Sequence, residues 1–133
     1  MRLRKKGDKG MSSSNSTMVH KLQVALNSRG YRILCNRTQF YSTEQKRPVT
    51  IYKISQAVWD ESTARFKHEE IFSTASEIQE VLFLRNLWYA VQGKEIPLTN
   101  EMKGAFEFKM KWDSFVDNGL DYFLKNVDKP DKV

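Results

Sequence analysis

The chain has 133 residues, of which 40% are apolar and 29% charged, and its 22 Lys and Arg outnumber 16 Asp and Glu to give a formal net charge of +6. A chain of this length buries roughly two thirds of the surface that its unfolded state exposes, so one ordinary core can form without disulfides or metal. The lone Cys35 excludes a disulfide framework, and no apolar run approaches the roughly 20 residues that span a bilayer. We therefore expect a cytoplasmic protein with one folded domain.

Most of the positive charge lies at the start of the chain, which holds Arg2, Arg4, Lys5, Lys6 and Lys9 against Asp8. A serine-rich stretch follows. These residues offer little apolar surface to bury, so the sequence predicts a disordered tail over residues 1–17. The remainder is close to electrical neutrality and predicts one domain over residues 18–127, followed by a frayed end over residues 128–133.

The domain begins with a predicted helix and continues as three predicted strands. Ser16 and Thr17 are acceptable N-caps for a helical pattern that starts at Met18 and closes before Gly30. The segments that follow are rich in β-branched and aromatic side chains and are separated by short polar turns. These predicted strands span residues 31–41, 49–59 and 65–72. Short connections of this kind favour an antiparallel meander.

The rest of the chain has helical patterns. Thr74-Ala75-Ser76-Glu77 has the form of a capping box, and apolar side chains follow at helical spacing up to Val91. Another helix is expected to start within Pro97 to Asn100, and Asn118-Gly119 separates it from a short piece through Leu124.

Together the elements predict an α+β fold in the order α-β-β-β-α-α. The predicted sheet is a three-stranded antiparallel meander, and the helices pack on one of its faces.

A helix, three strands and a helix in this order resemble a double-stranded RNA-binding domain. Such domains carry lysines at the start of the last helix, where they contact phosphates. The corresponding segment here carries the carboxylates of Glu77 and Glu80 and no lysine. Because carboxylates repel phosphates, we interpret the shared order as topology without shared function.

No arrangement of residues in the sequence supports catalysis. Glu44-Gln45-Lys46 matches three letters of a nuclease motif, but no carboxylate precedes it on the first strand to complete a metal pair. His20 and His68 are the only histidines, and neither has a second histidine at the spacing of a helical metal site. We therefore expect no enzymatic activity, no metal and no cofactor.

Two binding functions remain open. Basic and aromatic side chains alternate in the predicted sheet, a mixture that binds single-stranded nucleic acid by charge and stacking. The candidates for this function are Arg32, Arg37, Tyr41, Arg47, Tyr52, Lys53 and Trp59. We treat nucleic-acid binding as the alternative function.

The favoured function is contact with another protein, of which a second copy of this chain is one candidate. The helix predicted before Gly119 carries more large apolar side chains than one packing neighbour needs, and exposed apolar patches commonly mark association. The candidate interface residues are Phe106, Phe108, Met110, Trp112 and Phe115. We expect a homodimer or a complex with another protein, and no membrane partner.

Four short segments form a distinctive sequence pattern when they are considered together. They are Gly30-Tyr31-Arg32-Ile33-Leu34, Thr38-Gln39-Phe40-Tyr41-Ser42, Ala57-Val58-Trp59-Asp60-Glu61 and Val81-Leu82-Phe83-Leu84-Arg85. In these segments the chain resembles small uncharacterised proteins of prophages and other mobile elements in low-GC Gram-positive bacteria, over about residues 20 to 115. The resemblance carries no catalytic residue and implies a cytoplasmic accessory protein.

Overall fold

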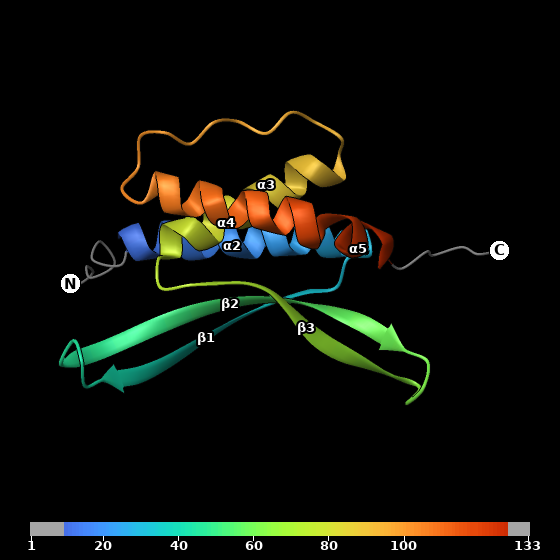
Figure 1. Cartoon of the computed structure of the whole chain (residues 1–133), viewed down its shortest axis with the longest axis horizontal. Coiled ribbons are helices and arrows are strands. Elements are labelled where there is room, and N and C mark those ends of the chain that lie inside the picture. The colour runs from blue at the N-terminus through green and yellow to red at the C-terminus, as the bar shows by residue number, and fades with distance from the viewer. Residues whose placement is uncertain (1–9, 128–133) are drawn as a thin grey trace, which may run out of the picture.

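The computed structural model describes residues 10–127, with side chains from residue 14 onward. These residues form two layers, a three-stranded antiparallel sheet and a set of helices that all lie on one side of it (Figure 1). Within the described residues the order is one helix, three strands and three more helices. The predicted α+β class, the meander and the placement of the helices on one face are confirmed.

The first helix, α2, spans Gly10–Ser28 and so begins before the predicted start at Met18. The prediction of disorder is therefore wrong for residues 10–17, while residues 1–9 and the predicted frayed end at 128–133 lie outside the described part of the chain. Extending a helix costs much less than nucleating one. A helix held by the buried Val19 and Leu26 therefore continues into the polar segment that precedes them.

The sheet has β2 at its centre. Its strands are β1 (Ile33–Ser42), β2 (Arg47–Asp60) and β3 (Arg65–Thr74). β1 pairs with residues 47–56 of β2, and β3 pairs with residues 52–60 of β2. All three strands therefore lie side by side only at residues 52–56, and beyond them the sheet continues as two-stranded ribbons whose ends bend away from the helices (Figure 1).

The two faces of the sheet carry different residues because side chains alternate along a strand. The face toward the helices holds Ile33, Ile54 and Phe72, all of which are buried. The opposite face is open, and it carries the exposed Trp59 and Phe66, which are paired across β2 and β3 with their rings 5.1 Å apart. The helices thus cover only one side of a sheet that has aromatic groups on both sides.

The two hairpins turn in the same way. The N–H of Lys46 donates to the Ser42 carbonyl at 2.7 Å, and the N–H of Ala64 donates to the Asp60 carbonyl at 2.8 Å. Lys46 and Ala64 have φ angles of 57° and 56°, which are in the left-handed region. Neither position holds the glycine that this conformation favours.

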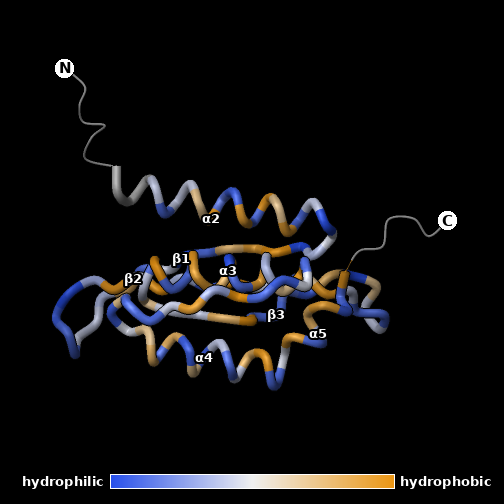
Figure 2. Tube along the Cα trace, turned by 90° about the horizontal axis from the view of Figure 1, so that it is seen from above, coloured by the Kyte–Doolittle hydropathy of each residue, from blue (hydrophilic) through white to orange (hydrophobic). Residues whose placement is uncertain are grey.

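Helix α3 spans Glu77–Val91 and occupies the middle of the helical layer, with α2 and α4 on either side (Figure 2). Its N-cap is Ser76, whose hydroxyl accepts from the Gln79 N–H at 3.3 Å. The predicted capping pair, Thr74 with Glu77, is therefore wrong. The Thr74 hydroxyl instead accepts from the Ser76 N–H and donates to the Gln79 side chain.

Helix α4 spans Ala105–Asn118, and α5 spans Leu120–Lys125. The helix predicted to start within residues 97–100 is therefore shorter than expected, because its first turn forms only after Gly104. Gly104 has a φ angle of +81°, and a Cβ there would lie 3.2 Å from the Gln79 side chain. The break at Gly119 and the short helix after it are confirmed.

The core lies between α3 and the sheet and is rich in stacked rings. Phe83 of α3 stacks on Phe72 of β3 with ring centres 4.2 Å apart. Tyr31 stacks on Phe123 of α5 at 5.0 Å, which brings the last helix against the start of the sheet. The buried Gln56 amide donates to the carbonyls of Phe123 and Asn126, both at 3.1 Å, and so fixes α5 to β2.

Candidate interaction site

The predicted interface on α4 is divided between the core and the surface. Phe108 and Trp112 are only 2% and 7% exposed, and Phe115 packs against Phe83 with ring centres 5.1 Å apart. These three positions lie at i, i+4 and i+7, so they share the helix face that packs on α3 and β3. The prediction that Phe108, Trp112 and Phe115 belong to an exposed apolar patch is therefore wrong, because Phe108 and Trp112 are part of the core and Phe115 packs against it.

The other two residues of that prediction lie on the opposite face of α4. Phe106 is 78% exposed and Met110 is 58% exposed, one helical turn apart. In the segment that precedes α4, Leu98 is 80% exposed. Leu98 and Phe106 are the most exposed large apolar side chains in the part of the chain that the structure describes.

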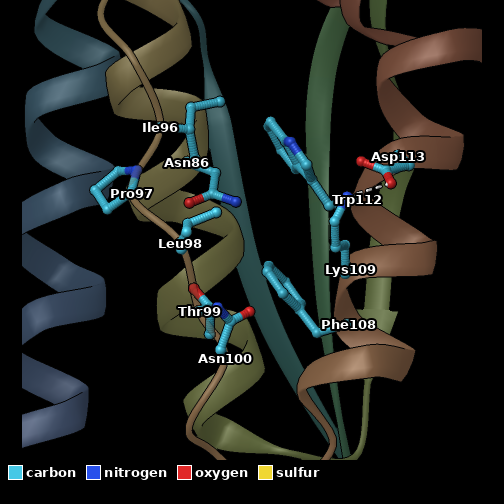
Figure 3. Close-up of a pocket in the computed structure, with 10 residues that line it drawn as sticks. All are labelled: Asn86, Ile96, Pro97, Leu98, Thr99, Asn100, Phe108, Lys109, Trp112 and Asp113. Atoms are coloured by element: carbon cyan, nitrogen blue, oxygen red, sulfur yellow. Dashed lines mark hydrogen bonds and ion pairs between the residues drawn. The ribbon is translucent and has the colours of Figure 1, made fainter.

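A pocket of about 190 Å³ lies between this preceding segment and α4 (Figure 3). We call it the α4 pocket. Its walls combine aromatic and aliphatic groups with a few amides and hydroxyls, and they consist of Asn86, Ile96, Pro97, Leu98, Thr99, Asn100, Phe108, Lys109, Trp112 and Asp113. Lys109 and Asp113 form an ion pair of 2.7 Å on the α4 side. The walls therefore come from α3, from the segment after it and from α4.

Arg85 holds this pocket open by fixing the segment after α3. Its Nη2 donates to the Pro97 carbonyl at 3.3 Å and to the Thr99 hydroxyl at 3.1 Å. Its Nε and Nη2 also donate to Oδ1 of the neighbouring Asn86, at 3.3 and 3.0 Å. One guanidinium group thus joins the helix, the loop and a buried amide.

The structure places the candidate nucleic-acid residues on two different faces. From the strand register, Arg47, Lys53 and Trp59 belong to the open face. Arg37, Tyr41 and Tyr52 belong to the face toward the helices.

Two of the candidate arginines have partners inside the protein. Arg37 lies over the Tyr52 ring and pairs with Glu77 of α3 at 3.5 Å. Arg32 lies at the end of the sheet, where it donates to the Ala57 carbonyl and stacks over Phe66. The seven candidate residues therefore do not form one continuous surface.

Sequence reasoning missed a group of ionisable residues beneath the first turns of α3. We call it the Glu80 cluster, and it consists of Cys35, Arg37, Tyr52, Glu77 and Glu80. Glu80 is 2% exposed, and its Oε1 has no hydrogen-bond partner among the described residues. The signal was in the sequence, because Glu80 lies four and seven residues before Leu84 and Leu87 and so falls on the buried stripe of α3.

The chemistry of this cluster is dominated by burial. Burial raises the pKa of Glu80 to about 7, while Arg37 opposes this rise and Glu77 adds to it. Burial together with the charge of Glu80 raises the pKa of the Cys35 thiol to about 12, so Cys35 carries no thiolate near neutral pH. The pKa of Tyr52 is raised as well, first by burial and then by Glu77. The α4 pocket is not lined by this cluster.

In the part of the chain that the structure describes, no group of three or more His, Cys, Asp or Glu side chains has the geometry to hold a metal ion. No described helix combines the length and apolarity that crossing a membrane requires. Comparisons with protein-family models, with curated proteins and with solved structures gave no match. The similarity to prophage proteins therefore stays a prediction.

Proposed function

We propose that this protein acts by binding another polypeptide through the outer face of α4 and the segment that precedes it, and that it works as an accessory protein without catalysis of its own. The observation that supports this proposal is the exposure of Phe106, Met110 and Leu98, beside a pocket with aromatic walls. Removing large apolar side chains from water is the main driving force of protein association. The first partner to test is a second copy of the chain.

Self-association is measured by sedimentation equilibrium over a wide concentration range. We expect a dimer that the double change Phe106→Ser with Met110→Ser weakens at least tenfold. Both side chains point to solvent, so the change leaves the fold intact. Tyr41→Ser is the matched control, because Tyr41 is 62% exposed but lies on β1, away from α4.

A different protein partner is tested by photo-crosslinking. A benzophenone amino acid placed at position 106 is expected to give a covalent adduct in extracts of the source cells, and the same group at position 41 is expected to give none. An excess of the chain without the benzophenone group must abolish the adduct. An excess of the chain with both Phe106→Ser and Met110→Ser must leave the adduct in place. The proposed function is refuted if the protein is a monomer at every concentration and position 106 gives no adduct that the unlabelled chain abolishes.

The alternative function is binding of single-stranded nucleic acid on the open sheet face. It is favoured by the exposed Trp59 and Phe66 rings and by Lys53 on the same face. This function predicts oligonucleotide affinity that falls steeply with salt and drops on Trp59→Ala, because stacking on aromatic side chains contributes about 1–3 kcal/mol per base. Fluorescence anisotropy of a labelled oligonucleotide measures both effects. If the protein binds the oligonucleotide at low salt no more tightly than it binds a neutral polymer, the alternative function is excluded.

A further inference from the structure

The α4 pocket has the size of a site for one aromatic ring. Its volume is about 190 Å³, and a cavity of about 150 Å³ in a protein core accommodates a benzene molecule. Sites for whole cofactors or drug-sized ligands are larger, from about 300 Å³ upward. The volume of the pocket therefore matches a single ring with its substituent.

The walls of the pocket suit a ring. Phe108 and Trp112 project from α4 toward the segment that carries Leu98, with Pro97 beside it (Figure 3). A ring placed between them meets other rings in the offset or edge-on contacts that aromatic groups prefer. Phe108 and Trp112 are themselves held by the core, so these walls are formed before any ligand arrives.

The side-chain NH₂ group of Asn86 is a hydrogen-bond donor in the wall of the pocket. Asn86 is 3% exposed, and its Oδ1 accepts both hydrogen bonds from Arg85. A guanidinium group can only donate, so the oxygen of the Asn86 amide must face Arg85 and the NH₂ group must face away from it. Among the described residues no acceptor bonds to this NH₂ group, and the side chain lines the pocket (Figure 3).

A ligand that enters the pocket displaces the water that can reach this NH₂ group, so a ligand that supplies an acceptor is favoured, because leaving the donor unpaired is costly. Among protein side chains, tyrosine combines one ring with an oxygen that accepts a hydrogen bond. We propose that the α4 pocket receives a tyrosine side chain of the partner polypeptide, with Asn86 donating to its hydroxyl oxygen. This inference rests on the proposed function for the source of the tyrosine.

A polypeptide source, rather than a free small molecule, follows from the surroundings of the pocket. Leu98 is part of its wall and is 80% exposed, and α4, which supplies the other wall, also carries the exposed Phe106 and Met110. A free ring would leave these side chains in water. A chain that continues on both sides of a tyrosine covers them.

The proposal is tested with small probes on the isotope-labelled full chain by NMR. We expect p-cresol, the side chain of tyrosine, to shift the Trp112 indole N–H and the Asn86 amide and to bind about fivefold more tightly than toluene, as one added hydrogen bond implies. N-acetyl-tyrosinamide is expected to bind more tightly than free tyrosine. Shifts confined to other residues, or equal affinity for toluene and p-cresol, would overturn the proposal.

The role of the Asn86 donor is tested by Asn86→Asp. The carboxylate still accepts from Arg85, which preserves the architecture, but it cannot donate into the pocket. The nitrogen of benzonitrile can accept a hydrogen bond but cannot donate one. Benzonitrile is therefore expected to bind the Asn86→Asp variant at least tenfold more weakly than it binds the unmodified chain. The same variant is expected to retain p-cresol, because a phenol can donate to the carboxylate. Equal affinities of the two chains for benzonitrile would overturn the role of the donor.

The source of the tyrosine is tested by Met110→Ser, a change at an exposed position outside the pocket walls that is expected to leave the melting temperature unaltered. It is expected to weaken N-acetyl-tyrosinamide at least threefold and p-cresol very little. Tighter binding of free tyrosine than of the blocked amide would instead identify a small-molecule site and overturn the polypeptide source. These outcomes are independent of the crosslink at position 106, so pocket binding without a competed crosslink counts against the proposed function alone.

Discussion

The buried carboxyl of Glu80 should make the protein less stable at neutral pH than at mildly acid pH. Burial raises its pKa in the folded chain from 4.5 to about 7, which corresponds to about 3 kcal/mol of destabilisation once the group is ionised. Between these two pH values the folded chain holds a proton that the unfolded chain has released. The free energy of unfolding therefore falls as the pH rises from 4.5 to about 7, and this contribution is constant above that range.

Glu80→Met removes the ionisable group and retains a side chain of similar length with good helix propensity. The variant is expected to be more stable than the unmodified chain at about pH 8, and its advantage is expected to shrink by about 3 kcal/mol at about pH 4. Part of its advantage should persist at low pH, because the protonated carboxyl still leaves a buried oxygen without a hydrogen bond.

Urea unfolding of both chains at a series of pH values gives the required free energies. The relevant quantity is the difference between the two chains at each pH, in which the contributions of the groups that both chains share cancel. Glu107→Met is the matched control, since Glu107 lies in a helix but its side chain is 66% exposed. A difference for Glu80→Met that does not change with pH would refute the argument, even if the variant were more stable throughout.

Other elements of the fold lead to further predictions, each measured as a change in the free energy of unfolding. Gln56→Met should lower the free energy of unfolding by about 1–3 kcal/mol, because it removes the two hydrogen bonds that Gln56 donates to the end of α5, and unchanged stability would contradict the role assigned to that amide. Ser76→Ala should lower the free energy of unfolding by about 1 kcal/mol, because it removes the N-cap of α3. Glu77→Ala should leave this cap intact, because Thr74 and Glu77 are not the capping pair of α3. Ala64→Gly should stabilise the protein by about 0.5–1 kcal/mol, because Ala64 has a positive φ angle, and a loss of stability would show that the turn differs in solution.

Local periodicity predicted the elements with the clearest patterns. The alternation of the strands and the break at Gly119 depend on neighbouring residues, and both are found in the structure. The same periodicity would have separated Phe106 and Met110 from the buried stripe of α4, since Phe108 and Trp112 are one turn apart and face α3. That error came from counting aromatic residues without assigning each one to a helix face.

Features that depend on distant residues could not be predicted in this way. The segment before α4 is held by Arg85, and this contact fixes one wall of the α4 pocket against α3. The Glu80 cluster likewise requires β1 and α3 to meet, which brings Arg37 to Glu77 across forty positions of the chain. The sequence pattern placed Glu80 on a helix, but only the packing of that helix shows that its carboxyl lacks water.

The limited overlap of the three strands gives the sheet two regions of different stability. Residues 52–56 of β2 are bonded on both sides and lie beneath the helical layer, whereas each outer ribbon has a single pairing partner. Two-stranded ribbons are marginal on their own and open without global unfolding. Amide hydrogens near the Lys46 and Ala64 turns should therefore exchange with solvent orders of magnitude faster than those around Ile54, and the ends of the sheet can reshape against a bound molecule while the centre keeps its form.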